Sequence, residues 1–132
     1  MLSQTAVSSL SAVVGAAVTF AFGGWSESLT VLLVAMAIDY ITGVTAAISQ
    51  KEGLSSIVGA MGLAKKGIML LVILLAHRID LLLGLQNDLA MGAAVYFYLA
   101  NELISITENL GQIGVPLPDR LRGLIEQLKN KK

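Results

Sequence analysis

The sequence predicts an all-α integral membrane protein with four transmembrane helices and a short amphipathic helix at the C-terminus. Three observations predict this class. Apolar residues make up 55% of the 132 residues and charged residues only 14%, a balance more apolar than a soluble domain of this size normally has. The apolar residues gather in four runs, each close to the roughly 20 helical residues that cross a bilayer core of about 30 Å. Short polar segments separate the runs.

The four runs form two pairs, with predicted spans at about residues 6–25, 29–48, 67–85 and 89–106. Within each pair only about three polar residues separate the spans, so each pair is expected to form a helical hairpin. The connection between the hairpins, residues 49–66, is expected to include a short interfacial helix. The third run contains three ionisable residues. A protein with three spans, in which this run does not cross fully, is therefore the alternative topology.

Glycine and proline residues predict the end of the transmembrane domain. Gly111, Gly114, Pro116 and Pro118 follow the fourth run and are expected to end its helix. Residues 1–110 then form the transmembrane domain, and 111–132 form a cytoplasmic helix with a basic tail. The apolar residues of this helix recur every three or four positions, as in an amphipathic helix; they are Leu121, Leu124, Ile125 and Leu128. Such a helix suits an anionic membrane surface, and a solvated tail is the alternative.

The cationic residues predict the orientation in the membrane. Except for Arg78, every lysine and arginine lies in the connection between the hairpins or in the tail, whereas the hairpin turns carry only Glu27 and Asp88. Because cationic loops stay in the cytoplasm, both termini are expected there. The predicted membrane-surface residues are Lys51, Lys65, Lys66, Arg120, Arg122, Lys129, Lys131 and Lys132. No basic region precedes the first run, so we expect a span there and not a cleaved signal peptide.

Small residues at intervals of one helical turn predict helix packing. In the first span they are Ser11, Gly15, Thr19 and Gly23, and in the second span Ala35, Gly43 and Ala47 share a face with Asp39. In lipid the hydrophobic effect does not press helices together, so faces of small residues mark the places where backbones approach closely. The contact can lie within one subunit or between subunits, and the spacing does not decide between them.

Polar residues inside the spans form a predicted polar seam. They are Asp39, His77, Arg78, Asp80, Asn101, Glu102 and Ser105. A charged side chain near the bilayer centre costs about 2.5 to 3.5 kcal/mol, so these groups are expected to be paired, protonated or in contact with water. The seam is either a static set of contacts that orients the helices or a surface that lines a pore.

Pairing within the seam follows from helical spacing. His77 and Asp80 are three residues apart and can face each other, whereas Arg78 needs a partner from another helix. We predict that Arg78 pairs with Glu102, with Asp39 as the second choice. Glu108 and Asn109 are expected at the level of the lipid headgroups, where a solvated helix end explains them.

Several function classes are excluded by composition. The chain has no cysteine and one histidine, which removes disulfides, thiol nucleophiles and Cys/His zinc sites. The formal net charge is zero, so there is no basic excess for nucleic acid. Neither a nucleophile elbow nor a phosphate-binding loop is present. The sequence therefore predicts no enzyme activity, no cofactor, no metal and no nucleic-acid partner, and membrane lipid is its first partner.

An ordered set of motifs resembles one family. Residues 39–43 read Asp-Tyr-Ile-Thr-Gly, Lys-Lys-Gly stands at 65–67, and an acidic residue follows at Asp80. Residues 101–109 read Asn-Glu-Leu-Ile-Ser-Ile-Thr-Glu-Asn, and Gly-Val-Pro-Leu-Pro at 114–118 precedes a leucine-rich helix with a lysine tail. From about residue 36 to the C-terminus, this pattern resembles the phage lysis and toxin-secretion holins, the family that includes the clostridial toxin-export holin.

The resemblance implies a multi-pass protein of the bacterial cytoplasmic membrane that forms homo-oligomers and opens lesions. A murein hydrolase or a large toxin would leave through the lesion, or depolarisation would activate the hydrolase, and an antiholin is a further partner that the family allows. Two other functions fit four spans with buried acidic residues. One is a small proton-coupled exporter built around Asp39 or Glu102, and the other is a non-conducting antiholin-type membrane protein.

Overall fold

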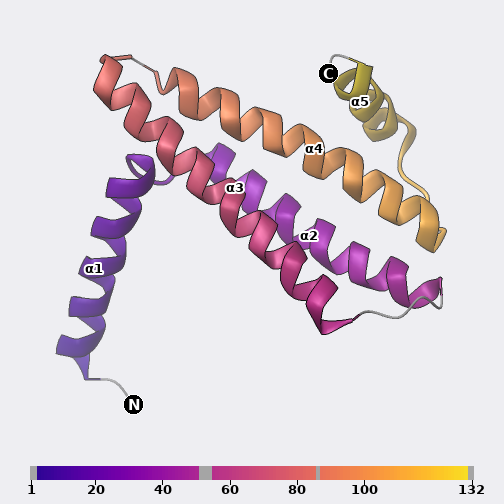
Figure 1. Ribbon diagram of the computed structural model, residues 1–132, viewed down its shortest axis with the longest axis horizontal. Coiled ribbons are helices and arrows are strands. Elements are labelled where there is room, and N and C mark those ends of the chain that lie inside the picture. Colours follow the sequence, from indigo (N-terminus) through magenta and orange to yellow (C-terminus); the bar gives the residue numbers. More distant parts are fainter. Residues whose placement is uncertain (1–2, 51–54, 86, 131–132) are drawn as a thin grey trace.

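The protein is a set of five helices, seen here in a computed structural model that describes residues 3–50, 55–85 and 87–130 (Figure 1). Their bounds are α1 Gln4–Phe22, α2 Glu27–Ser49, α3 Ser56–Leu83, α4 Leu89–Ile113 and α5 Asp119–Asn130. Within the described ranges no strand is present. Helices α1 to α4 are each long and apolar enough to cross a membrane. The predicted class, four membrane-length helices and a short C-terminal helix, is confirmed.

Local sequence signals explain where the helices begin and end. Ser3, Ser26 and Ser55 stand directly before α1, α2 and α3, and each hydroxyl accepts a hydrogen bond from a backbone N–H in the first turn. Such caps satisfy donors that have no partner inside the helix. At the other end, α1, α3 and α4 stop at glycines in the left-handed conformation, namely Gly23, Gly84 and Gly114, where glycine avoids the strain of a side chain.

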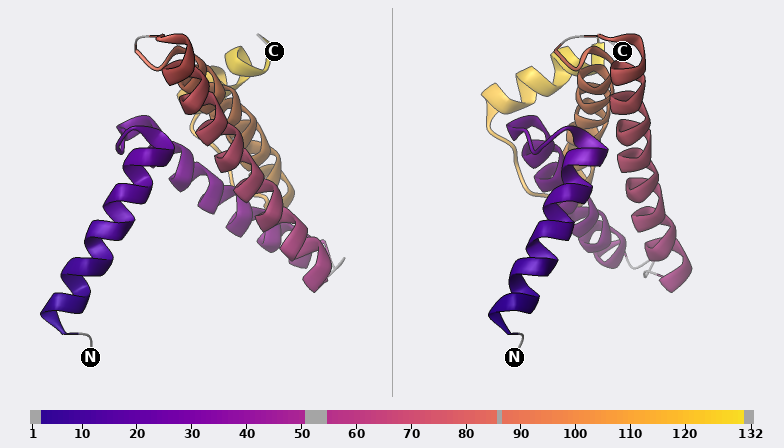
Figure 2. Two further views of the ribbon diagram at one scale, coloured as in Figure 1. Left: turned by 60° about the vertical axis from the view of Figure 1, so that its left-hand side comes forward. Right: turned by 90° about the vertical axis from the view of Figure 1, so that its left-hand side faces the viewer.

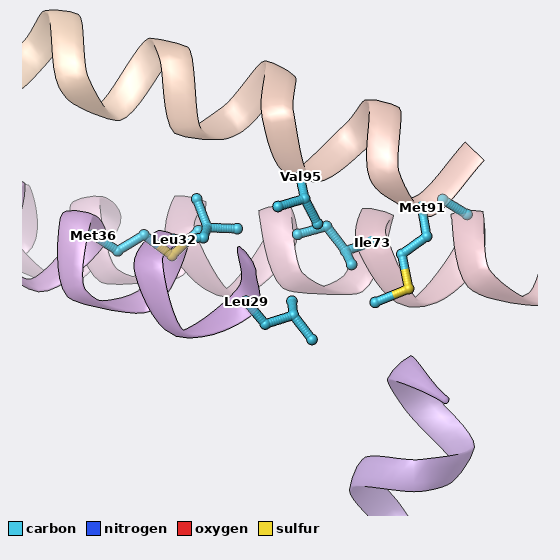
Figure 3. Close-up of a cluster of buried hydrophobic side chains, with 7 residues drawn as sticks. Leu29, Leu32, Met36, Ile73, Met91 and Val95 are labelled. Carbon is cyan, nitrogen blue, oxygen red and sulfur yellow. The ribbon is translucent and has the colours of Figure 1, made fainter. Parts of the chain in front are cut away.

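Helices α2, α3 and α4 form a bundle. Helix α2 packs along α4 in the same direction, and α3 runs in the opposite direction against α4 (Figure 1). A buried apolar cluster joins the three helices (Figure 3), with Leu29, Leu32, Met36, Ile73, Ala76, Met91 and Val95 as its members. The cluster occupies the N-terminal halves of α2 and α4 and the C-terminal half of α3. In the opposite half of the bundle, the buried apolar residues Ala46 and Ile106 accompany the buried Glu102.

Helix α1 extends away from this bundle (Figure 2). None of its residues is buried, and its contacts with another helix are with α3. The first predicted hairpin is thus wrong in its packing, because α1 makes no contact along α2 within the described residues. The turn lies where it was expected, but Gly23 and Gly24 adopt φ angles of 72° and 123° that redirect the chain. Since lipid solvates an apolar helix on all sides, nothing forces α1 back onto α2.

Two predicted boundaries shift. Helix α3 begins at Ser56 and runs without a break to Leu83, so the separate interfacial helix expected between the hairpins is wrong. Helix α4 continues through Gly111 to Ile113, since a single glycine weakens a helix by only about 1 kcal/mol. Helix α5 folds back against α4 with Ile125 buried (Figure 1), whereas Leu121 and Leu124 stay exposed.

Candidate functional site

A cluster of three charged residues lies between the bundle helices, one from each. The Nζ atom of Lys66 in α3 lies 2.9 Å from Asp39 Oδ2 in α2. The same atom lies 3.0 and 2.9 Å from the two carboxylate oxygens of Glu102 in α4. The Lys66 and Asp39 side chains are 15% and 14% exposed and that of Glu102 only 3%. One ammonium group therefore serves two carboxylates, and we call these three residues the triad.

The predicted partner of Glu102 was wrong. Arg78 does not reach Glu102 or Asp39: its Nη1 donates to the backbone oxygen of Phe20 at 3.5 Å, and its guanidinium lies 4.4 Å from the centre of the Phe20 ring. Arg78 follows Lys66 by twelve residues, which is about 18 Å along a helix. Glu102 lies at the level of Lys66. Arg78 instead attaches the end of α1 to α3.

Lys66 was predicted at the membrane surface, and its position in the triad corrects this. Sequence reasoning placed residues 49–66 in a connecting segment, where a lysine is expected to be solvated. Once α3 begins at Ser56, Lys66 is three turns inside a helix and faces the other two. The available signal was the Lys-Lys-Gly motif, whose second lysine is the buried one.

Asn109 extends the triad toward the C-terminal end of α4. Its Nδ2 donates to Asp39 Oδ1 at 2.9 Å, to the Asp39 backbone oxygen at 3.1 Å and to Thr42 Oγ1 at 3.0 Å. Gly43 lies beside it, since a Cβ at this glycine would be 3.5 Å from the same nitrogen. Asn109 was expected at a solvated helix end and contacts α2 instead. Its neighbour Glu108 is exposed, and its position at the headgroups stays a prediction.

A cavity of about 440 Å³ adjoins the triad and is lined by residues of α2, α3 and α4. Asn101 and Ser105, both predicted in the polar seam, line this cavity. The amide oxygen of Asn101 is buried and has no hydrogen-bond partner in the part of the chain that the structure describes. Tyr40 also lines the cavity and donates from its hydroxyl to the Gly59 backbone oxygen at 3.3 Å. Polar groups thus face a hollow between apolar helices.

The remaining seam residues lie at the opposite end of the bundle. Asp80 is 1% exposed and accepts hydrogen bonds from the backbone N–H groups of Ala90 and Met91 at 2.7 and 2.9 Å. His77 is also buried, and its Nδ1 lies 3.8 Å from Asp88 Oδ1. The single predicted seam is therefore two clusters, one around Lys66 and one at the turn between α3 and α4.

The two faces of small residues have different surroundings. On α2, Ala35 is buried, and Gly43 and Ala47 line the cavity beside α4, so this face packs within the subunit. On α1, Ser11, Gly15 and Thr19 are exposed, with open space beside Gly15. Gly23 packs on the His77 ring, where a Cβ would lie 2.7 Å from Cε1.

The predicted membrane-surface residues are only partly described. Lys65, Arg120 and Arg122 are exposed, which is compatible with contact to lipid headgroups but does not test it. Lys129 belongs to α5. Lys51, Lys131 and Lys132 lie outside the described residues. The surface role of all these residues stays a prediction.

Comparisons with known proteins agree with the motifs. The sequence model of the bacteriophage holin family matches residues 16–130. A protein described as a probable holin, from Bacillus phage phi105, is 44% identical over 95 residues, covering 72% of this chain and 69% of its own. An uncharacterised 14.9 kDa protein of Clostridium perfringens is 42% identical over 118 residues, 89% of each chain. The uncharacterised protein YqxH of Bacillus subtilis is 40% identical over 113 residues, 86% of this chain and 79% of its own. No solved structure matches.

The family match and the four apolar helices together indicate a membrane protein of non-enzymatic character. The matched range contains every residue of the triad and its neighbours, whereas most of α1 precedes it. The motifs at 39–43, 65–67 and 101–109, which are far apart in the sequence, meet around one cavity. Three of the family motifs therefore describe one place in the structure, whereas Asp80 and residues 114–118 lie outside it.

Proposed function

This chain belongs to the bacteriophage holin family, and on that premise we propose that it accumulates in the cytoplasmic membrane of a bacterium, oligomerises and opens lesions. A murein hydrolase then reaches the cell wall through the lesion or is activated by depolarisation. Alternatively, a large exported protein passes through the lesion. Both termini lie in the cytoplasm, as the distribution of lysine and arginine favours.

The observation that carries this proposal is the triad. Three charged side chains sit between helices that are otherwise apolar enough to cross a membrane. Charged groups at such positions are costly unless they are paired or in contact with water, and they usually mark functional positions. In the packed bundle Lys66 pairs with both carboxylates. In an assembly whose helices separate, the same groups face water and line a polar path.

Helix α1 supplies the surface for assembly in this proposal. It is the apolar helix with no buried residue, and it presents the exposed Ser11 and Thr19 together with Gly15, which has open space beside it. Small residues one turn apart allow two helices in lipid to approach closely. A second copy packed there would extend the protein laterally without disturbing the bundle.

The experiment is inducible expression in a bacterium while membrane potential and release of a cytoplasmic enzyme are followed. The parent should depolarise the cells abruptly and release the enzyme. Asp39→Asn should alter the time of onset, and Gly15→Leu should delay or abolish it by blocking close approach. Val14→Leu is the matched control for Gly15→Leu, because it enlarges an already exposed apolar side chain one residue away.

The outcome separates three functions. Depolarisation with enzyme release supports lesions, whereas depolarisation without release indicates a small pore. Normal potential and growth at a verified membrane level would contradict the proposal. In that case the two carboxylates beside a cavity favour the second candidate, a proton-coupled exporter. An exporter predicts saturable transport. An antiholin-type protein predicts neither leakage nor transport, but delays a co-expressed holin.

A further inference from the structure

Helix α3 is attached to its neighbours differently along its length. Its C-terminal half contributes Ile73 and Ala76 to the apolar cluster, and Asp80 accepts two hydrogen bonds from the backbone of α4. Apolar packing and these buried hydrogen bonds fix this half. Its N-terminal half, from Ser56 to Lys66, contributes no residue to the cluster. A different set of contacts must hold that half.

Polar contacts across the cavity help to hold the N-terminal half of α3, where Gly59 is buried and Gly62 lies against the Tyr40 ring. Ile57, Val58, Met61 and Leu63 are exposed large apolar residues of this half. Contacts between α2 and α3 are sparse compared with those between α2 and α4. Among residues 3–50, 55–85 and 87–130, the hydrogen bonds and ion pairs that bridge the gap are Tyr40 to Gly59 and Lys66 to both carboxylates. This half therefore depends on the ammonium group of Lys66.

We propose that the ion pairs of Lys66 hold the N-terminal half of α3 against α2 and α4, and we call these contacts the latch. Opening breaks them, so that this half of α3 moves away from α2 and α4 while its C-terminal half stays fixed. The 440 Å³ cavity then widens into a gap lined by Asp39, Asn101 and Glu102. The role of this movement in leakage rests on the proposed function. The movement itself is a property of the bundle and is measurable without any leakage.

The physical reason is the imbalance of charge in the triad. Two carboxyl groups share one ammonium group, so removal of that group leaves the negative charge of the pair between the helices with no counter-charge. Breaking a buried pair in this way is strongly destabilising, whereas removing all its members together is often neutral. In the open arrangement water solvates the carboxylates. Loss of the Lys66 charge should therefore favour the open arrangement by about 100-fold, at about 1.4 kcal/mol for each factor of ten.

The first test measures the movement by cross-linking, which the absence of cysteine in the chain makes clean. The test pair is Val44→Cys in α2 with Val58→Cys in α3, because both side chains line the cavity that should widen. The control pair is Gln50→Cys with Gln112→Cys, which joins α2 to α4 at a site where Gln50 donates to the Gln112 oxygen. Isolated membranes are treated with a short, reducible bis-methanethiosulfonate reagent, and the rate of cross-linking is measured for each pair.

Lys66→Met should slow cross-linking of the test pair strongly and leave the control pair unchanged. Lys66→Arg keeps the cation and should behave like the parent. If Lys66→Met does not accumulate, the comparison uses Asp39→Asn, Lys66→Met and Glu102→Gln together, which removes every charge and should restore the parent rate. Equal rates for the test pair in the parent and in Lys66→Met, or a slow rate in the uncharged variant, would overturn the latch.

The second test links the movement to leakage. Cells that express the test pair are cross-linked before onset, and depolarisation should be blocked until a reductant is added. Cells with the control pair should depolarise on time while cross-linked. If the test pair depolarises on time while cross-linked, α3 does not move in opening and the latch is wrong. If the parent never depolarises, the proposed function fails, and the cross-linking rates still decide whether Lys66 holds α3.

Discussion

The carboxylate of Asp80 in α3 accepts a hydrogen bond of 2.9 Å from the backbone N–H of Met91 in α4. A second bond of 2.7 Å comes from Ala90. Asp88 occupies the N-cap position of α4, but its backbone is left-handed and its side chain makes no capping bond. An aspartate from the preceding helix thus caps α4, and it joins the two helices at the same time.

Asp80→Ala should destabilise the bundle, because two buried N–H groups lose their acceptor, at a cost of about 1–3 kcal/mol. Asp88→Asn is the matched control and should cost well under 1 kcal/mol, since asparagine tolerates the left-handed backbone and only a long contact with His77 is lost. Unfolding of both variants in mixed detergent micelles measures the difference. Equal stability of the two variants would contradict the capping role of Asp80.

Gly23→Ala should destabilise the junction of α1 with the bundle. The φ angle of 72° is unfavourable for alanine, and the added Cβ would lie 2.7 Å from the His77 ring. Gly24→Ala has a φ of 123° but open space, so it isolates the backbone strain from the clash. Gly15→Ala, in open space inside a helix, should be neutral or stabilise by up to about 1 kcal/mol. The same unfolding measurement should show that Gly23→Ala and Gly24→Ala are both less stable than Gly15→Ala.

Arg78 and Phe20 should show an energetic coupling of about 0.5–1 kcal/mol, the usual strength of an exposed cation–π contact. A double-mutant cycle with Phe20→Leu and Arg78→Gln measures the coupling as the departure from additivity. The cycle of Arg78→Gln with Glu102→Gln is the control and should be additive, since these side chains do not meet. Coupling in the control cycle alone would restore the partner that the sequence predicted.

Asn109→Ala should destabilise the bundle by about 1–2 kcal/mol, because three acceptors on α2 lose their donor and interhelical hydrogen bonds in membranes have about this strength. Glu108→Ala, at the adjacent exposed position, is the control and should have no measurable effect. Stability in bicelles compares the two variants. A similar loss in both would mean that the Asn109 bonds contribute nothing specific.

Single cysteines should report the orientation of the helices. Glu27→Cys and Asp88→Cys lie at the turns between α1 and α2 and between α3 and α4 and should react with an impermeant maleimide outside intact cells. Lys65→Cys and Arg122→Cys should react only after lysis. Reaction of Arg122→Cys from outside would place the C-terminus on the wrong side for the proposal and would reverse the orientation drawn from the cationic residues.

The sequence determined the number of long helices and most of their ends, because these signals are local, whereas the start of α3 and the end of α4 were misplaced. Apolar runs of sufficient length predict the four long helices, and Ser26, Ser55 and Gly84 define ends through hydrogen bonds with neighbouring residues. It also identified Asp39 and Glu102 as groups that cannot face lipid, since the cost of a charge in a bilayer does not depend on its partner.

Only the tertiary structure decided which partners those groups have. Lys66, and not Arg78, reaches Glu102 because α3 continues back to Ser56 and presents Lys66 at the level of the two carboxylates. Asn109, expected at a solvated helix end, faces Asp39 because α4 continues as a helix to Ile113 and packs along α2. The axial position and rotation of one helix against another are set by packing along their whole length. No short sequence motif predicts them. The sequence did not determine the direction of α1 either, because lipid solvates the surface of an apolar helix as well as protein does.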